Sequence, residues 1–98
     1  MKFIFQMTEN QQLVGVAVLN RTGMQGYIPE NLLVYIAVHK DCRGKGLAQK
    51  MLNRILQLTN GDIALHVEKN NPVIDLYKKV GFENPYLEMR YNVAKQKK

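Results

Sequence analysis

The sequence predicts an α/β fold in which a mixed β-sheet carries two helices. Three observations support it: an antiparallel pair of strands at the start of the chain, a strand–helix–strand unit in the middle, and a second helix before a last strand. The chain has 98 residues, which is the length of one domain. We therefore expect residues 1–98 to form a single unit.

The first half of the chain alternates between apolar runs and polar segments. Residues 2–7 and 13–19 are expected to be strands, and the short polar turn 8–11 makes them antiparallel. Residues 20–31 contain two glycines and a proline and indicate a loop. Residues 32–38 form a continuous apolar run, which is typical of a central strand covered on both faces.

A helix and another strand follow this central strand. Apolar residues recur with the helical period from about Gly44 to Thr59, and Asn60-Gly61 ends the pattern. Residues 63–67 have the composition of the next strand. A strand, a helix and a strand in this order predict a parallel pair joined by a right-handed crossover.

A second helix and a last strand complete the expected order. Asn71 is expected to cap this helix, with Pro72 at its first position. The helix runs to Val80 and ends at Gly81-Phe82, because glycine suits the position after a helix end. Residues 87–91 alternate between apolar and polar side chains and predict the final strand.

Composition and charge favour a globular protein in a reducing compartment. The share of hydrophobic residues is 46% and that of charged residues is 22%. The single cysteine, Cys42, cannot form an internal disulfide, which favours a cytoplasmic location. The apolar start is too short to span a membrane, so no membrane partner is expected. The net charge is +6, but basic residues are not interleaved with aromatic ones, so no nucleic-acid partner is expected.

The segment between the central strand and the first helix has the composition of an anion site. Glycines let the backbone approach a ligand. The first N–H groups of a helix lack internal partners and attract negative charge. The segment is Arg43-Gly44-Lys45-Gly46-Leu47-Ala48, and Lys40 adds a further positive charge. It predicts a phosphate or pyrophosphate ligand, with a simple tight turn as the alternative, because Gly-x-Gly is a short motif.

This segment resembles the acyl-coenzyme A loop of the GNAT N-acetyltransferase superfamily. The family pattern is Arg/Gln-x-x-Gly-x-Gly/Ala after a strand ending in valine. Here it is met by Val38, Arg43, Gly46 and Ala48. Residues 70–82 resemble the second family signature, Asn-x-x-Ala-x-x-Leu-Tyr-x-x-x-Gly-Phe, with a valine in place of the alanine. Each motif alone is weak, but the pair in this order and at this separation is specific.

The resemblance implies an N-acetyltransferase that moves an acetyl group from acetyl-CoA to an amine by direct attack. The acceptor would be a small-molecule amine or a protein amine. The family binds the donor through the loop and the end of the central strand, where a backbone N–H serves as oxyanion donor. The expected cofactor-binding residues are Ile36, Ala37, Val38, Arg43, Gly44, Lys45, Gly46, Leu47, Ala48, Asn70 and Tyr77.

Two of these residues have competing structural interpretations. Tyr77 matches the tyrosine that, in many family members, reprotonates the coenzyme A thiolate, which makes it the expected catalytic residue. The alternative is a helix tyrosine packed on the sheet. Asn70 either bonds the pantetheine arm or holds the loop before the second helix. The alternative function is a catalytically degenerate domain that binds acyl-CoA as a sensor or interaction module.

Other polar residues are weaker candidates. Cys42 could carry an acyl group, but a bystander thiol is favoured because no His–Asp pair supports it. His66 and Glu68 project from the same side of one expected strand and could relay a proton, or could be polar edge groups. Glu30 is a similar candidate. His39, His66 and Cys42 do not have the spacing of a metal site, so no metal is expected.

The resemblance also predicts the oligomeric state. Family members begin with a strand and two helices before the hairpin, and this chain has no room for them, so it resembles a truncated or minimal member. Residues 2–7 would then be a sheet edge that is apolar on both faces, and one face of the sheet would be bare. A two-fold homodimer is expected. The alternative is a monomer whose edge is covered by residues 20–31 or by the C-terminal tail.

Overall fold

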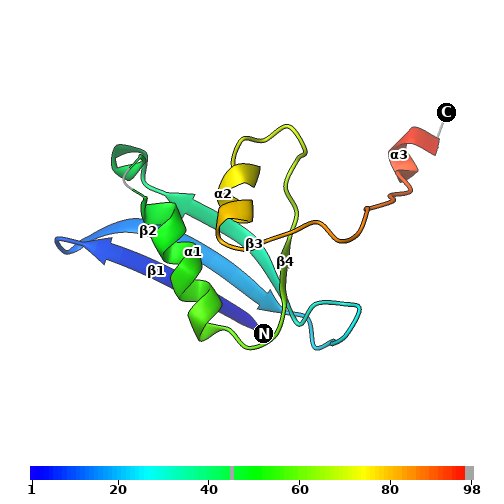
Figure 1. The fold of residues 1–98 in the computed structure, drawn as a ribbon, viewed down its shortest axis with the longest axis horizontal. Coiled ribbons are helices and arrows are strands. Elements are labelled where there is room, and N and C mark those ends of the chain that lie inside the picture. The colour runs from blue at the N-terminus through cyan, green and yellow to red at the C-terminus, as the bar shows by residue number, and fades with distance from the viewer. Residues whose placement is uncertain (45, 97–98) are drawn as a thin grey trace.

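The computed structural model describes residues 1–44 and 46–96, in which a four-stranded sheet carries two helices on one side and a short C-terminal helix lies away from it (Figure 1). The strands lie in the order β1-β2-β3-β4. They are β1 (Lys2–Glu9), β2 (Gln12–Arg21), β3 (Asn31–Val38) and β4 (Ile63–Leu65). The helices are α1 (Leu47–Leu58), α2 (Ile74–Lys79) and the terminal α3 (Val93–Gln96), with a 3-10 turn η1 at Lys40–Cys42.

The expected N-terminal hairpin is present, with longer strands and a tighter turn than the sequence suggests. β1 and β2 pair antiparallel from Lys2↔Asn20 to Glu9↔Gln12. Only Asn10 and Gln11 form the turn, and both have positive φ angles of 50° and 66°. Two successive residues in the left-handed region are what a two-residue hairpin turn needs in order to match the twist of its strands.

The strand–helix–strand unit is also confirmed. β3 pairs antiparallel with β2 and parallel with β4. The parallel ladder is short: it joins Asn31, Leu32 and Leu33 to Ile63, Ala64 and Leu65. β4 therefore ends two residues earlier than expected. Within the described residues, the second half of β3 has no neighbour on the β4 side.

β3 contains a bulge that was not predicted from the sequence. Leu33 lies opposite Leu19 and Tyr35 lies opposite Val18, so Val34 has no opposite residue in β2. A bulge of this kind bends its strand and increases the local twist. The parallel ladder with β4 stops at Leu33, one residue before this bulge.

The core lies between the sheet and α1. Ala17, Leu19 and Leu33 of the sheet face Met51, Leu52 and Ile55 of α1, and each of these side chains is at most 6% exposed. The helical stripe expected between Gly44 and Thr59 therefore exists, although the helix itself begins at Leu47. Burying such side chains stabilises the domain by roughly 1.5–3 kcal/mol each.

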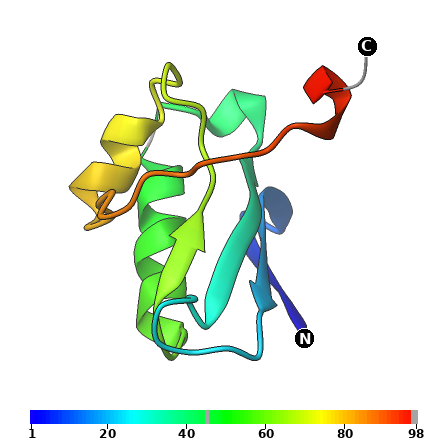
Figure 2. The ribbon, with the colours of Figure 1, turned by 90° about the vertical axis from the view of Figure 1, so that its right-hand side faces the viewer.

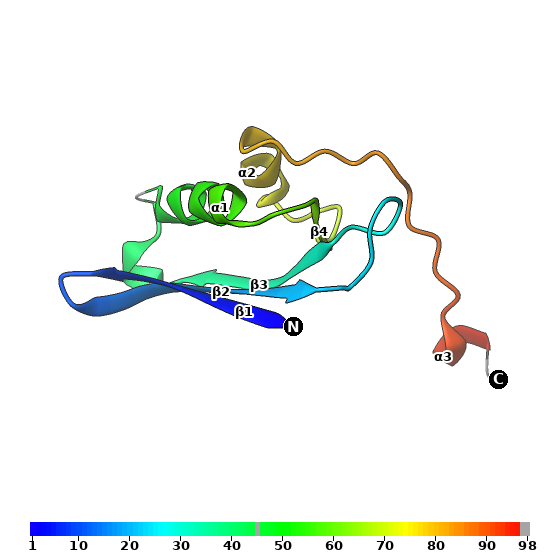
Figure 3. The same ribbon diagram turned by 90° about the horizontal axis from the view of Figure 1, so that it is seen from below.

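The expectation that the central strand is covered on both faces is wrong. Figure 3 shows α1 and α2 on the same side of the sheet. On the other side Ile4, Val34 and Tyr35 are 62%, 51% and 55% exposed. Ile4 lies opposite Val18, which in turn lies opposite Tyr35, so these residues form a row across three strands. The bare sheet face anticipated from the sequence is present.

The second helix is shorter than expected, and Asn71 closes a turn before it, so the expected cap at Asn71 with Pro72 at the first helical position is wrong. Asn71 Oδ1 accepts a hydrogen bond from the N–H of Val73 (3.0 Å), and its carbonyl accepts one from Ile74 (3.1 Å). These bonds close a turn over residues 71–74, and α2 begins only at Ile74. At the other end Gly81 has a φ of 115°, and the N–H of Phe82 donates to the carbonyl of Tyr77 (2.9 Å). A glycine that reverses the chain in this way is a common helix stop.

The final strand expected at residues 87–91 is absent, and this part of the predicted fold is wrong. Leu87, Met89 and Tyr91 are 85%, 89% and 74% exposed. The segment follows α2 and leads to α3 without joining the sheet (Figure 2). It is held by side chains instead of a ladder, because Glu88 contacts both His66 (2.9 Å) and Arg90 (2.8 Å). Alternation alone does not make a strand when no neighbour pairs with it. None of the helices in residues 1–44 and 46–96 is long and apolar enough to cross a membrane.

Candidate functional site

The candidate site begins where β3 ends and α1 starts. Eight residues connect Val38 to Leu47, and the described ones include the turn η1. Gly44 and Gly46 have φ angles of 81° and 74°, a left-handed conformation that other residues rarely adopt. Both glycines are therefore needed to lead the chain from the sheet edge into the helix.

The first turn of α1 is a candidate anion site. The first α-helical hydrogen bond runs from Lys50 N–H to the Gly46 carbonyl (3.1 Å), so the earlier N–H groups have no partner in the helix. Among the residues that the structure describes, no side chain caps this end, and the first turn of the helix contains no acidic residue. The side chain of Leu47 is 6% exposed and packs in the core, so only its backbone N–H can serve a ligand. The positive end of the helix dipole favours a phosphate here.

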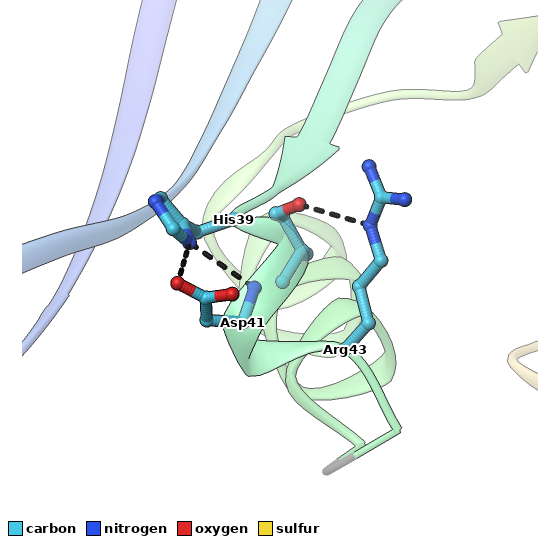
Figure 4. A network of polar contacts seen from close by, with 4 residues as sticks. His39, Asp41 and Arg43 are labelled. Atoms are coloured by element: carbon cyan, nitrogen blue, oxygen red, sulfur yellow. Dashed lines mark hydrogen bonds and ion pairs between the residues drawn. The ribbon is translucent and has the colours of Figure 1, made fainter.

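Arg43 adds a positive charge beside these amides. Its Nε donates to the carbonyl of Val38 (3.3 Å), which holds the side chain along the end of β3. Figure 4 shows the outer guanidinium nitrogens of Arg43 pointing away from the pair formed by His39 and Asp41. Lys45, another expected contact, lies outside the described residues. The carbonyl of Val38 accepts this bond and keeps a second lone pair.

The end of β3 also presents a backbone edge. Ile36, Ala37 and Val38 lie opposite Ala17, Val16 and Gly15 of β2, but the β4 ladder stops before them. An extended ligand with amide groups can pair with such an edge in the way an added strand does. The bulge at Val34 lies between the β4 ladder and this edge. No residue type near Val34 signals the bulge, and donor contacts at Ile36, Ala37 and Val38 remain a prediction.

Tyr77 lies on α2, on the same side of the sheet as α1. It packs against the core and is half-buried. Burial raises the pKa of the Tyr77 hydroxyl above its usual value, because an ionised phenolate is poorly solvated there. The side chain lines a groove of about 1000 Å³ together with Ile63, Leu65 and Ile74. The packing interpretation of Tyr77 is therefore confirmed, and its role as the catalytic acid remains a prediction.

The turn before α2 separates the roles of two asparagines. Asn70 is exposed, whereas Asn71 supplies the hydrogen bonds that shape the turn. Holding the loop is thus the work of Asn71. A contact between Asn70 and the donor remains a prediction.

The weaker candidates are not brought together. His66 and Glu68 lie beyond the end of β4, and His66 pairs with Glu88 from the C-terminal segment. Glu30 precedes β3 and lies against Gly61. A Cβ added to Gly61 would be 2.8 Å from the carboxylate of Glu30. The length of β3, about 25 Å for eight residues, separates Glu30 from the anion site. The two-residue period was a poor guide to His66 because the strand ends before it.

Cys42 has a structural role in η1. Its N–H donates to the carbonyl of His39 (2.8 Å), and its side chain is half-buried. Within the described part of the chain, no group of three or more His, Cys, Asp and Glu side chains gathers into a possible metal site.

Comparison with known proteins gives the family. Residues 2–84 match the acetyltransferase (GNAT) domain family, which covers most of the chain. The chain belongs to the GNAT acetyltransferase family. The match includes both the loop at the start of α1 and the segment around Tyr77, so the resemblance that rests on those two motifs is confirmed.

Solved structures show the same fold. A protein of Pyrococcus furiosus assigned as an acetyl transferase superposes with a TM-score of 0.75 at 22% identity, covering 95% of this chain and 66% of that one. An aminoglycoside acetyltransferase from an uncultured soil metagenomic sample gives a TM-score of 0.71 at 15% identity, covering 94% and 66%. This GNAT chain therefore spans about two thirds of the length of these structures.

A relative in sequence is also found among curated proteins. The GNAT chain is 36% identical over 55 residues to the cysteine-rich protein 2-binding protein of Mus musculus. The match covers 55% of this chain and 7% of that protein, so it concerns one segment of a much longer relative.

Proposed function

We propose that this chain is an N-acetyltransferase that takes the acetyl group of acetyl-CoA and passes it to an amine by direct attack. Family membership supports acyl transfer in general. One observation carries the proposal: the open backbone edge of Ile36–Val38 lies beside the uncapped start of α1. An anion site and a strand edge at the same place suit a ligand with a pyrophosphate at one end and amides along an extended arm.

The donor would be held by backbone groups more than by side chains. The pyrophosphate would accept hydrogen bonds from the N–H groups that precede Lys50, with Arg43 adding charge. The pantetheine arm would pair with the β4 side of Ile36–Val38. Asn70 and the hydroxyl of Tyr77 would contact the same arm from α2 and the turn before it. This arrangement places the thioester near the end of the open edge.

The chemistry follows from these groups. A neutral amine attacks the thioester carbonyl, and a backbone N–H near Ile36–Val38 donates to the carbonyl oxygen as it gains negative charge. The carbon–sulfur bond then breaks, and the departing thiolate takes the proton of the Tyr77 hydroxyl. The attacking nitrogen loses a proton to solvent, and a proton from solvent returns the Tyr77 phenolate to its neutral form. The pKa of Tyr77 lies above the ordinary tyrosine value, so the hydroxyl carries its proton at neutral pH.

Two observations support an amine as the acceptor. The structural neighbour from soil is an aminoglycoside acetyltransferase, and aminoglycosides carry amino groups. The groove lined by Tyr77 has apolar walls from β4 and α2 and is open enough for a small molecule or a side chain. We place the reaction in the cytoplasm, because the single free cysteine favours a reducing setting.

A second function has a specific observation in its favour. Apart from Tyr77, the acids and bases suggested by the sequence are elsewhere: His66 pairs with Glu88, and Glu30 lies at the far end of β3. A domain that binds acyl-CoA without turnover would need the loop and the strand edge but no acid or base. The two functions share the donor site and differ only in catalysis.

Titration calorimetry with acetyl-CoA and an assay of coenzyme A release test the proposal together. Binding in the micromolar range is expected for an anion site combined with strand pairing. Release of coenzyme A should then depend on an added primary amine, with aminoglycosides and lysine-containing peptides as the first acceptors. Binding without amine-dependent release favours the sensor, and absence of binding contradicts both functions.

A further inference from the structure

His39 joins three parts of the structure at the end of β3. Its N–H donates to the carbonyl of Val14 in β2 (2.7 Å), and its carbonyl accepts from the N–H of Cys42 (2.8 Å). Its imidazole Nδ1 accepts from the N–H of Asp41 (3.2 Å), which makes His39 the cap of η1 (Figure 4). One residue therefore fixes the sheet end and the turn that follows it.

The position of Arg43 depends on this turn. The N–H of Arg43 lies 3.4 Å from the carbonyl of Lys40 and closes η1, while its Nε bonds to Val38 (3.3 Å). Arg43 leads directly into Gly44 and the start of α1. A change in the turn would thus move both the guanidinium and the first amides of the anion site.

His39 also lies next to the one acidic residue in the sequence between β3 and α1. Asp41 is the only carboxylate among residues 39–46, and an acid is unfavourable beside a phosphate. Its Oδ2 lies 3.7 Å from His39 Nδ1. Figure 4 shows Asp41 on the side of His39, turned away from Arg43. The turn that His39 caps therefore fixes the backbone of the residue that carries this negative charge.

We propose that His39 is a positioning residue of the acyl-CoA loop, which orders η1 by accepting the N–H of Asp41 at its Nδ1. The inference rests on the proposed donor binding. It assigns to His39 no contact with the donor and no part in the chemical step. An imidazole accepts a hydrogen bond at Nδ1 only when that nitrogen carries no proton, so the capping form is the neutral one.

Replacing His39 tests this role, because its side chain is 52% exposed and its loss leaves no hole in the core. In His39→Ala the affinity for acetyl-CoA should fall by about three- to thirtyfold, the range expected for a lost helix cap. His39→Asn restores a short acceptor at the same position and should return the affinity to within about twofold of the natural protein. The thermal midpoint of unfolding should be nearly the same in all three proteins.

Rescue by asparagine separates positioning from a general effect on the fold. His39→Ala binding as tightly as the natural protein would overturn the inference. Equal weakening in the Ala and Asn variants would overturn it too, because the loss would then not follow the acceptor. A KM for acetyl-CoA that rises in His39→Ala while kcat stays constant supports a role in donor binding alone.

Amide hydrogen exchange reads the cap without any ligand. In the natural protein and in His39→Asn the N–H of Asp41 should exchange slowly, and in His39→Ala it should exchange at the rate of an open turn. If the natural protein does not bind acetyl-CoA, the proposed function fails whatever the exchange rates show. If it binds and the exchange of Asp41 is the same in all three proteins, binding stands and the role of His39 is wrong.

Discussion

The ring of Tyr77 meets the ring of Phe82 edge-on, with centroids 5.7 Å apart and planes inclined at 68°. Edge-to-face pairs of this kind are stabilising and fix the direction of both rings. The Phe82 N–H also donates to the Tyr77 carbonyl (2.9 Å), so ring and backbone are held by the same neighbour. Removal of the Tyr77 hydroxyl should therefore leave the ring in place.

Tyr77→Phe is expected to slow turnover by about ten- to a thousandfold, the usual scale for loss of one general acid. Acetyl-CoA binding should be nearly unchanged, because the phosphate site and the strand edge are untouched. Steady-state kinetics and calorimetry measure the two effects. Tyr35→Phe, on the bare sheet face, is the matched control and should have natural activity. Natural turnover in the Tyr77 variant would leave this tyrosine with a packing role only.

The pH dependence of Tyr77 can be derived from the direction of its pKa shift. Burial raises the pKa in the folded protein above the unfolded value of about 10. The stability linked to the neutral hydroxyl is thus fully present below the unfolded pKa and is lost as pH rises through the folded pKa. The tyrosinate absorbance is followed against pH in the natural protein and in Tyr77→Phe. The difference between the two curves should show one tyrosine that ionises at a higher pH than the exposed ones. Coincident titration curves would contradict the shift.

Gly46→Glu is expected to abolish acetyl-CoA binding. The new carboxylate would stand at the start of α1, where it repels a pyrophosphate and blocks its approach. Gly23→Glu is a close control, because Gly23 has a φ of 76° against 74° for Gly46, and a Cβ at either position meets no atom within 4 Å. Both variants carry the same backbone strain and charge, but only one carries them at the loop. Equal binding by the two variants in calorimetry would place the donor elsewhere.

The elements that the sequence predicted well are those set by local rules. The stripe that includes Leu47, Met51 and Ile55 is buried as its spacing requires. Asn71 closes a turn through its own side chain, although α2 begins only at Ile74. These features depend on residues a few positions apart, so the sequence contains them directly. The glycines of the loop belong to the same class, because each has the positive φ that only glycine adopts easily.

The features that the sequence did not reveal depend on distant partners. The bulge at Val34 arises from its pairing with β2, and no residue type near it signals an unpaired position. The alternation of residues 87–91 matches a half-buried strand, yet the segment is tied to His66 through Glu88 and has no ladder. A pattern predicts which side of a strand would be apolar. It does not show whether a neighbouring strand is available.

Asn31 should be the most sensitive polar position for stability. It is fully buried at the start of β3, and its Nδ2 donates to the carbonyls of Asn60 (2.8 Å) and Asp62 (3.1 Å). These bonds join the segment between α1 and β4 to the start of β3. Asn31→Ala leaves two carbonyls without this partner and should lower the free energy of unfolding by about 1–3 kcal/mol. Urea denaturation measures it, with Asn53→Ala on the exposed side of α1 as the control that should lose little.

A two-fold dimer through β1 is the remaining expectation from the sequence. β1 is an edge strand of eight residues, and its Phe3 and Ile4 are 39% and 62% exposed. An apolar edge of this length is a template for pairing with another chain, and closed two-fold pairing is the commonest outcome. Antiparallel pairing of two β1 strands would join two sheets into one. Light scattering after size exclusion should therefore give the mass of a dimer at micromolar concentrations.

Three lysine substitutions locate the interface. Ile4→Lys should yield a monomer, because it places a charge on the edge strand without disturbing the core. Phe5 is a poorer choice, since it packs against the core and its loss would also destabilise the fold. Leu87→Lys lies in the exposed C-terminal segment and should remain a dimer. Tyr35→Lys changes the bare face two strands away from the edge and should also remain a dimer if β1 strands pair. Dissociation by Tyr35→Lys would mean that two copies pack through the bare faces of their sheets. A monomer mass for the natural protein would contradict the dimer and show that β1 does not pair with a second chain.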